Sequence, residues 1–251
     1  MTAAEPTPSA TPGVRLSIVV PVFNERTTIV EVLRRVDAAC ADKEILVVDD
    51  GSTDGTRGVL LDPASTLPAA VRVILQDRNR GKGAALRRGF AEARGAIVII
   101  QDADLELNPA DYARLLPPIE RGEASVVYGS RFLKARRGGS EAHYYLANRL
   151  LTSLSNLVTG LRLSDVWTGY KVFRREVLTG IVLEEDRFGF EPEVTAAIAR
   201  GGWTIAEVPV SYQPRRRAEG KKIRMGDALN GVWCTLKHAP IVRRLRRRSG
   251  A

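Results

Sequence analysis

The sequence predicts an α/β fold, with a mostly parallel sheet flanked by helices and a C-terminal helical element. Two observations carry this prediction. From Leu16 onward, short apolar runs rich in β-branched residues alternate with amphipathic stretches, a pattern typical of parallel βαβ units with right-handed crossovers. The chain also has 251 residues, 44% of them hydrophobic, which is enough to bury a sizeable core.

The first half of the chain has the clearest strand and helix periodicity. In the stretch 27–40, Ile29, Leu33 and Val36 fall on one helical face. A glycine pair opens the next helix, and Gly95 closes it. We therefore expect strands at 16–23, 44–50, 71–75 and 96–100, and helices at 27–40 and 80–95.

Beyond Pro109 the alternation is looser, but the same elements continue. We expect helices at 111–122, 142–160 and 191–200, and strands at 124–130, 170–175 and 203–212. The chain then divides into a disordered N-terminal tail (1–14), one domain (15–224), and an amphipathic helix with a basic tail (225–251).

Charge and cysteine content limit the classes of protein. The net charge is +9, and basic clusters at 134–137, 214–224 and 241–248 would attract nucleic acid, phosphorylated ligands or anionic lipids, unless they are simply solvated. Cys40 and Cys234 predict free thiols in a reducing cytoplasm. No stretch approaches the ~20 apolar residues of a membrane span, and the N-terminus lacks the features of a secretory signal. A soluble or peripheral cytoplasmic protein is expected.

Polar residues gather at the predicted strand ends, where open parallel sheets bind their ligands. In "DDGSTDGT" we expect Asp54 to cap a helix and Asp50 to contact a ligand. In "NRGKG", glycine N–H groups and the ammonium of Lys82 could hold an anion. The segment fits neither the P-loop nor the GxGxxG pattern, which argues against an ATPase and a Rossmann dehydrogenase.

The acids of "QDADLE" directly follow the fourth predicted strand. Asp102, Asp104 and Glu106 repel one another, and a buried carboxylate without a partner is costly. Oxygen-only ligands suit a hard cation such as Mg²⁺ or Mn²⁺, which would relieve the repulsion and neutralise a departing diphosphate. A lone DxD is common, but beyond a βαβ sheet with three other polar strand ends it indicates a metal site.

These motifs together resemble a known family. "PVFNE", "VDDGSTDGT", "NRGKGAALRRG", "DADLE" and "GSR" occur in the order and spacing of family-2 glycosyltransferases with the GT-A fold, the Rossmann-like fold of nucleotide-diphospho-sugar transferases. "DVWTGYKVFRR", "RFGFEPEV", "EVPVSY" and "RRRAEGKKI" narrow the resemblance to the polyprenyl-phosphate hexose synthases, similar to dolichyl-phosphate mannose and glucose synthases. It covers residues 16–223.

The resemblance implies a role for each matching residue. The nucleotide-sugar would be bound by Pro21, Phe23, Glu25, Asp50, Lys82, Asp102, Ala103 and Asp104. The metal ligands would be Asp102, Asp104 and Glu106. The catalytic group would comprise Asp104, Arg131, Asp165, Arg215 and Lys222. The segment "EGKKI" around Lys222 lacks the family's Ser, and "VWT" after Asp165 departs from its commoner small or cysteine residues.

The implied reaction is metal-dependent, inverting transfer of a hexose to polyprenyl phosphate from GDP-mannose, UDP-glucose or a UDP-N-acetylhexosamine. A lipid monophosphate has a second pKa of ~6 and is mostly a dianion near neutral pH, so it needs little help from a general base. Arg131 and Arg215 would neutralise phosphates, and Asp165 would orient the sugar or an arginine.

Two other functions are suggested by parts of the sequence. A transferase of the same fold could act on a soluble saccharide, protein or small molecule, although the basic segment 214–224 favours a phosphate acceptor. A nucleic-acid-binding protein is suggested only by the pI of 9.9. No nucleic acid is expected, because a stacking platform and a recognition helix are missing from the sequence and the acids would be unexplained.

The C-terminal stretch has three alternative roles. Leu229, Val232, Trp233 and Leu236, with the basic tail, could lie on the inner face of an anionic membrane, where each basic residue contributes about 1 kcal/mol. Trp233 and Leu236 could instead pack against the domain, or the stretch could bind a membrane-bound partner protein.

Overall fold

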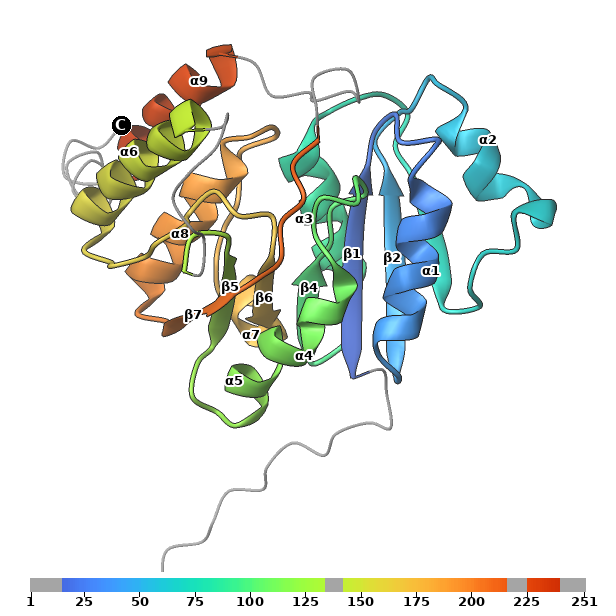
Figure 1. Ribbon diagram of the computed structural model, residues 1–251, viewed down its shortest axis with the longest axis horizontal. Helices are drawn as coiled ribbons and strands as arrows, with labels where there is room; N and C mark the ends of the chain where they lie inside the picture. The colour runs from blue at the N-terminus through green and yellow to red at the C-terminus, as the bar shows by residue number, and fades with distance from the viewer. Residues whose placement is uncertain (1–14, 134–141, 216–224, 240–251) are drawn as a thin grey trace, which may run out of the picture.

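The structure is a computed structural model of the chain, and it describes residues 15–133, 142–215 and 225–239. One seven-stranded sheet organises these residues, with strand order β3-β2-β1-β4-β6-β5-β7 (Figure 1). Its strands are β1 (Leu16–Val22), β2 (Lys43–Asp49), β3 (Val71–Leu75), β4 (Ile97–Ile100), β5 (Val126–Ser130), β6 (Lys171–Arg174) and β7 (Ile205–Pro209). The predicted α/β class is confirmed.

The sheet is parallel except at β6, which runs antiparallel to both β4 and β5. The other neighbours pair in parallel: β1 with β2 and β4, β2 with β3, and β5 with β7. As a result, the carboxyl ends of six strands and the start of β6 lie at one edge of the sheet. The residues between β5 and β6, and those after β7, are thereby brought beside the acids after β4.

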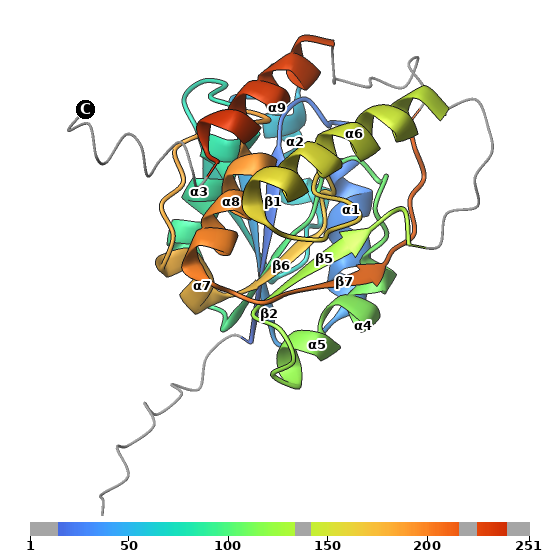
Figure 2. The same cartoon turned by 90° about the vertical axis from the view of Figure 1, so that its left-hand side faces the viewer.

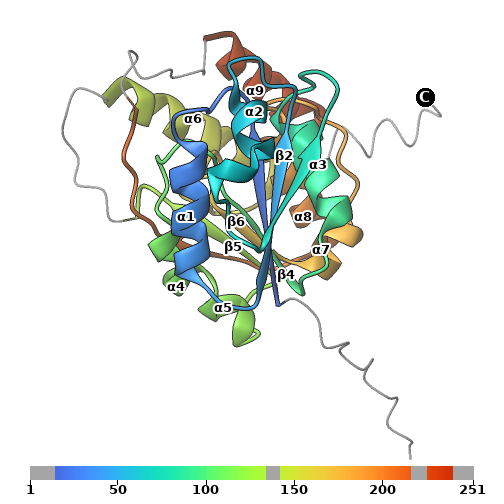
Figure 3. The same cartoon turned by 90° about the vertical axis from the view of Figure 1, so that its right-hand side faces the viewer.

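Helices cover both faces of this sheet, and Figure 3 shows α1 and α3 on opposite sides. One core cluster joins the sheet to α1, α4 and α5, and a second joins it to α3, α7 and α8. The helices are α1 (Ile29–Ala39), α2 (Thr56–Leu61), α3 (Lys82–Glu92), α4 (Tyr112–Leu115), α5 (Pro117–Glu120), α6 (Ala142–Thr159), α7 (Arg175–Thr179), α8 (Phe190–Gly201) and α9 (Met225–Lys237).

The helices form where apolar side chains recur at helical spacing. In α1 the buried residues are Ile29, Val32, Leu33 and Val36, which make one face of a 3.6-residue period. In β4 all four residues are buried, as expected for a central strand that is covered on both faces. These predicted elements are confirmed within a residue or two at their ends.

Three local features differ from the sequence predictions. The helix expected at 111–122 is two short helices, α4 and α5, which meet at Pro117, because proline has no N–H for the helical ladder. A helix after Asp54 was expected and is α2, whereas the short helix α7 was not predicted. The antiparallel direction of β6 was not predicted either, although it is compatible with the mostly parallel sheet that the sequence predicts.

Helices α6 and α9 pack on each other and on α8, and form an outer layer on one side of the molecule (Figure 2). In the described ranges no helix has both the length and the apolar character that a membrane span requires. The predicted tails at 1–14 and 240–251 lie outside the described residues.

Candidate active site

The acids that follow β4 lie in a loop tied to α1. The hydroxyl of Thr28 donates to the carbonyl of Ala103 at 2.8 Å, and the chain turns at Leu105, whose φ is 60°. The backbone N–H of Glu106 donates to Asp104 Oδ1 at 3.2 Å. This loop therefore places Asp104 and Glu106 close together on the side of the sheet edge next to α1.

Asp102 points toward the start of α3. Its Oδ1 lies 2.9 Å from the ammonium of Lys82, which is also 3.3 Å from Glu191 Oε1 on α8. Burial lowers the pKa of Lys82, but the carboxylates of Asp102 and Glu191 outweigh it and raise that pKa above its ordinary value. Lys82 is thus a cation at the site.

Asp104 carries the least compensated charge of the loop. Burial, followed by the charges of Asp102 and Glu106, raises its pKa to about 7, although the guanidinium of Arg215 acts in the opposite direction. A carboxyl group whose charged form is disfavoured in this way gains from a bound cation. The oxygen donors of Asp102 and Asp104 fit a hard cation such as Mg²⁺ or Mn²⁺.

Glu106 is held by its neighbours. Tyr212 donates its hydroxyl to Oε2 at 3.0 Å, and the backbone N–H of Arg215 donates to Oε1 at 3.0 Å. Across the described part of the chain, no three acidic, histidine or cysteine side chains are arranged to hold a metal. The roles of Asp102, Asp104 and Glu106 as metal ligands therefore stay predictions.

Arg215 joins three predicted site residues. Its guanidinium pairs with both oxygens of Glu25, at 3.2 and 2.8 Å, and its Nε donates to the carbonyl of Asp104 at 2.8 Å. Arg215 thus lies among the acids that the resemblance gives to the donor and the metal.

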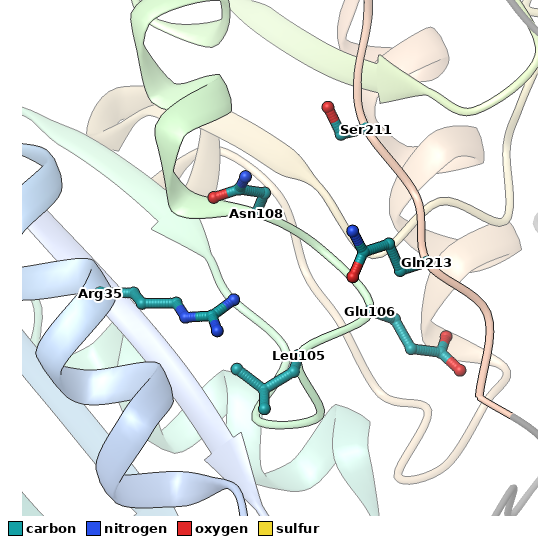
Figure 4. Close-up of a pocket in the computed structure, with 6 residues that line it drawn as sticks. All are labelled: Arg35, Leu105, Glu106, Asn108, Ser211 and Gln213. Atoms are coloured by element: carbon teal, nitrogen blue, oxygen red, sulfur yellow. The ribbon is translucent and has the colours of Figure 1, made fainter.

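A small polar pocket lies on the α1 side of this loop (Figure 4). Its lining comprises Arg35, Leu105, Glu106, Asn108, Ser211 and Gln213. In Figure 4 the Glu106 carboxylate points away from Arg35, toward the interactions with Tyr212 and Arg215 described above. The pocket therefore lies between α1 and the acid loop, and the Glu106 carboxylate is directed away from Arg35.

Asp50 organises the loop before α3. It is almost fully buried and accepts hydrogen bonds from the backbone N–H groups of Arg80 and Gly81 and from Gln76 Nε2, at 2.8, 2.7 and 3.1 Å. Burial raises its pKa, while the two backbone donors oppose this. The Gly81 N–H expected to bind an external anion is therefore bound to Asp50, so that interpretation of "NRGKG" is corrected.

The other donor-side residues line the end of β1. Pro21 and Phe23 are half-buried, and the N–H of Glu25 donates to Thr56 Oγ1 at 2.9 Å. Asp54 accepts from the N–H of Thr56 at 2.9 Å, but the N-cap of α2 is Gly55, so Asp54 lies one residue before the capping position that was predicted for it. These contacts hold the ends of β1 and β2 together.

Arg131 and Asp165 form a buried ion pair where β5 ends. Two guanidinium nitrogens of Arg131 donate to the two carboxylate oxygens at 2.7 and 2.9 Å, and Asp165 is completely buried. The guanidinium lies 5.1 Å from the centre of the Tyr212 ring and 5.4 Å from that of Phe132. Of the two roles expected for Asp165, the contact with an arginine is therefore present.

The sequence reasoning missed several residues of the site. Lys171 is fully buried and donates to the carbonyls of Val166 and Thr168. Glu191 is buried beside Lys82, and Tyr212 separates Arg131 from Glu106. A lysine directly before the buried apolar pair Val172 and Phe173 was a signal for Lys171, whereas Glu191 and Tyr212 had no distinguishing pattern. Lys222 lies outside the described residues.

The mixed α/β sheet has acids, a lysine and two arginines in ion pairs at one edge. This combination defines a glycosyltransferase of the GT-A architecture. The chain belongs to glycosyl transferase family 2, because the family profile "Glycosyl transferase family 2" matches residues 17–181. It is therefore an enzyme of that family.

Curated relatives refine this comparison. The chain is 32% identical over 210 residues to the undecaprenyl-phosphate 4-deoxy-4-formamido-L-arabinose transferase of Pseudomonas fluorescens, with 82% of this chain and 59% of the relative covered. It is 31% identical over 229 residues to the polyprenol monophosphomannose synthase of Mycolicibacterium smegmatis, with 87% and 85% covered. The chain thus spans about three fifths of the first relative and most of the second.

Solved structures confirm the fold. The glucosyl-3-phosphoglycerate synthase of Mycobacterium tuberculosis, in complex with Mn²⁺, UDP and glucosyl-3-phosphoglycerate, has a TM-score of 0.68 and 26% identity, with 90% of this chain and 80% of that chain covered. A second structure of that enzyme, with Mg²⁺ and UDP, has a TM-score of 0.67.

Proposed function

We propose that the chain moves a hexose from a nucleotide-diphosphate sugar to the phosphate of polyprenyl phosphate, with inversion at the anomeric carbon. One observation carries the proposal: Arg131 lies over the face of Tyr212, whose hydroxyl donates to Glu106 of the acid loop. Tyr212 thus lies between Arg131, which suits a phosphate acceptor, and the acid loop, which suits a donor with a metal-bound diphosphate.

On the donor side, the protein binds and orients the nucleotide. Pro21, Phe23 and Glu25 at the end of β1 contact the nucleoside, and Asp50 keeps the loop before α3 in place through Gly81. Lys82 supplies positive charge beside the phosphates. Asp102, Asp104 and, as predicted, Glu106 would hold Mg²⁺ or Mn²⁺, which when bound supplies the charge that neutralises the leaving diphosphate.

On the acceptor side, the protein positions an existing nucleophile. A phosphate monoester is mostly a dianion near neutral pH, since its second pKa is ~6, and its oxygen can attack without a general base. Arg131 holds this oxygen in line with the anomeric carbon, and Asp165 keeps the guanidinium plane fixed through its two hydrogen bonds. Positioning and charge neutralisation therefore provide the rate enhancement.

The similarity to two polyprenyl-phosphate enzymes supports this choice of acceptor. The mannose synthase of Mycolicibacterium smegmatis is the stronger support, because the alignment covers 85% of its length. Neither name fixes the donor sugar of this chain.

A membrane-bound acceptor requires a face that meets lipid, and α6 and α9 provide one. Leu146, Leu150 and Leu157 lie on one side of α6 and are 58 to 80% exposed, while α9 exposes Trp233 and Leu236. Packing of these two α9 residues against the domain, one of the sequence alternatives, is thereby contradicted. The proposed location is the inner face of the membrane, with the apolar side chains in an anionic leaflet or against a membrane-bound partner.

A transfer assay on the purified protein tests the proposal. GDP- and UDP-linked sugars carrying a radiolabel are supplied with Mn²⁺ or Mg²⁺ and a short-chain polyprenyl phosphate, and the label in the organic phase is counted. Metal-dependent glycolipid from one donor is the expected result. Hydrolysis or binding of a donor with no lipid product would overturn the choice of acceptor.

A small phosphorylated acceptor is the second candidate. The solved structures that resemble this chain include an enzyme in complex with phosphoglyceric acid, at a TM-score of 0.68, and Arg131 would suit either phosphate. The same assay distinguishes the candidates when phosphoglyceric acid replaces the lipid and the label is counted in the aqueous product.

A further inference from the structure

Lys82 lies at the centre of a partly buried group of charges that the proposed reaction alone does not explain. Its ammonium bridges Asp102 on the acid loop and Glu191 on α8, at 2.9 and 3.3 Å. The Glu191 carboxylate is almost fully buried, and its Oε2 has no hydrogen-bond partner within the described part of the chain. A buried carboxylate oxygen without a hydrogen bond is energetically costly, so we expect the Glu191 carboxylate to have a function.

The surroundings of Asp102 restrict how a divalent cation could reach it. Oδ1 faces Lys82, while Oδ2 lies against Gly169, where an added Cβ would come within 2.1 Å of it. A divalent cation that takes Oδ1 would approach the ammonium of Lys82, and the two positive charges would repel each other. Lys82 therefore has to leave Asp102 when the metal arrives.

Glu191 is placed to receive the displaced ammonium. It already contacts Lys82 through Oε1, and the unused Oε2 offers a second acceptor on the same carboxylate. Lys171, another cation that interacts with Glu191, is engaged by the carbonyls of Val166 and Thr168. Movement of Lys82 toward Glu191 would exchange one ion pair for another without exposing a buried charge.

We propose that Lys82 is the internal counter-cation of Asp102 in the ligand-free enzyme, and that Glu191 is the positioning residue that takes Lys82 over when the metal and the nucleotide diphosphate enter. The metal alone must compete with an ammonium ion. When a diphosphate binds together with the metal, its negative charge can interact with the released ammonium of Lys82. Metal uptake is thereby linked to the donor, and this inference rests on the proposed metal-dependent function.

Calorimetric titration of the full chain tests this linkage without measuring turnover. Mn²⁺ is titrated alone and in the presence of saturating UDP or GDP, into the wild type and into Lys82→Met. In the wild type, the nucleotide should tighten Mn²⁺ binding. In Lys82→Met, Mn²⁺ alone should bind at least about tenfold more tightly, the smallest effect expected from removing a charge in direct contact, and the nucleotide should add less.

Glu191 is tested by a double-mutant cycle with Glu191→Gln. In the wild-type background this change should weaken Mn²⁺ binding in the presence of nucleotide, because Lys82 has lost the carboxylate that receives it. In the Lys82→Met background it should have no further effect. The double variant lacks both the Lys82 and the Glu191 charge. We therefore expect it to fold even if Lys82→Met alone is destabilised by the unpaired Glu191.

Arg88→Met is the matched control, because Arg88 is an exposed cation on the same helix and pairs with Glu92. It should bind Mn²⁺ as the wild type does. Unchanged Mn²⁺ binding by both Lys82→Met and the double variant would overturn the inference, as would a Glu191→Gln effect of equal size with and without Lys82. A wild type that binds neither Mn²⁺ nor nucleotide would instead refute the proposed function, so the two failures are distinguishable.

Discussion

Arg131 and Asp165 form the most constrained ion pair of the site, and its geometry limits which substitutions can be tolerated. The planar guanidinium makes two parallel hydrogen bonds to a completely buried carboxylate. A lysine keeps the charge but not this fork. The pair therefore fixes the orientation of the guanidinium as well as its charge. This orientation determines how Arg131 can bind a phosphate.

Arg131→Lys should raise the KM for the phosphate acceptor by about tenfold or more, since one bidentate, charge-assisted contact is lost, while donor affinity stays unchanged. Steady-state kinetics with each substrate varied in turn would measure this. Arg114→Lys is the control, because Arg114 is an exposed arginine that also pairs with a buried carboxylate, that of Asp111. Equal loss of donor and acceptor affinity would place Arg131 on the donor side instead.

Lys171 leads to a prediction about pH. Burial lowers its pKa to about 8, from an ordinary value of 10.5. Between these two values the unfolded chain binds the proton and the folded chain releases it, so the stability rises with pH through this window. The free energy of unfolding of the wild type, relative to Lys171→Met, should therefore increase from about pH 8 to pH 10.5. Parallel denaturation curves across that range would contradict the assignment.

At the residue scale, the sequence predicted the charged groups but not their partners. Asp102 and Asp104 were found from their positions after an apolar run, because strand ends can be recognised in the sequence, whereas Arg131 came from the resemblance of "GSR" to a family motif. The contact of Arg215 with Glu25 joins residues 190 positions apart. Such a pairing depends on the order of strands, which periodicity does not contain.

At the scale of elements, the turn between Asp165 and Tyr170 supports two parts of the site. Lys171 holds its carbonyls, Asp165 orients Arg131, and Gly169 packs against Asp102. A side chain at Gly169 would have to displace the Asp102 carboxylate. The glycine is therefore needed for close approach, and its φ is not in the left-handed region.

Gly169→Ala should weaken Mn²⁺ binding in the presence of UDP, because the new methyl group moves Asp102. It should also lower the stability by roughly 1–3 kcal/mol, as overpacking does. Calorimetry and thermal melting measure the two effects. Gly58→Ala is a suitable control, since a Cβ there meets nothing within 4 Å. Metal binding like that of the wild type would show that Asp102 does not need its present position.

The α6 face gives a prediction about membranes. Leu150→Glu should reduce binding to anionic vesicles by about tenfold, because full burial of a leucine is worth roughly 1.5–3 kcal/mol, while transfer to a short-chain acceptor in detergent should be retained. Co-sedimentation measures the binding. Leu61→Glu makes the same change at an exposed leucine of α2, far from α6 in Figure 1, and should bind nearly normally. Equal losses in both variants would indicate a general charge effect.

For the whole molecule, alternation of strands and helices was sufficient to predict the class of fold and most element positions. The exception is β6, whose reversal between β4 and β5 has no signature in the apolar pattern, because parallel and antiparallel central strands are both buried on two faces. The helix pair α6 and α9 was found by amphipathicity, but the sequence left open whether Trp233 faces the domain or the surroundings.

The loop around Glu185 and Asp186 has a consequence for the order in which the enzyme can be completed during synthesis. The carbonyl of Asp186 accepts from Ala84 N at 3.1 Å, and that of Glu185 from Arg87 at 2.6 Å. Gly81 and Gly83 leave room for these two carbonyls. A nascent chain that ends after β5 already contains strands β1 to β4, yet the loop before α3 still lacks the two carbonyl groups that close it. These carbonyl groups are synthesised about a hundred residues after the helix that they contact. The first half of the fold is therefore completed only when this later segment has been made.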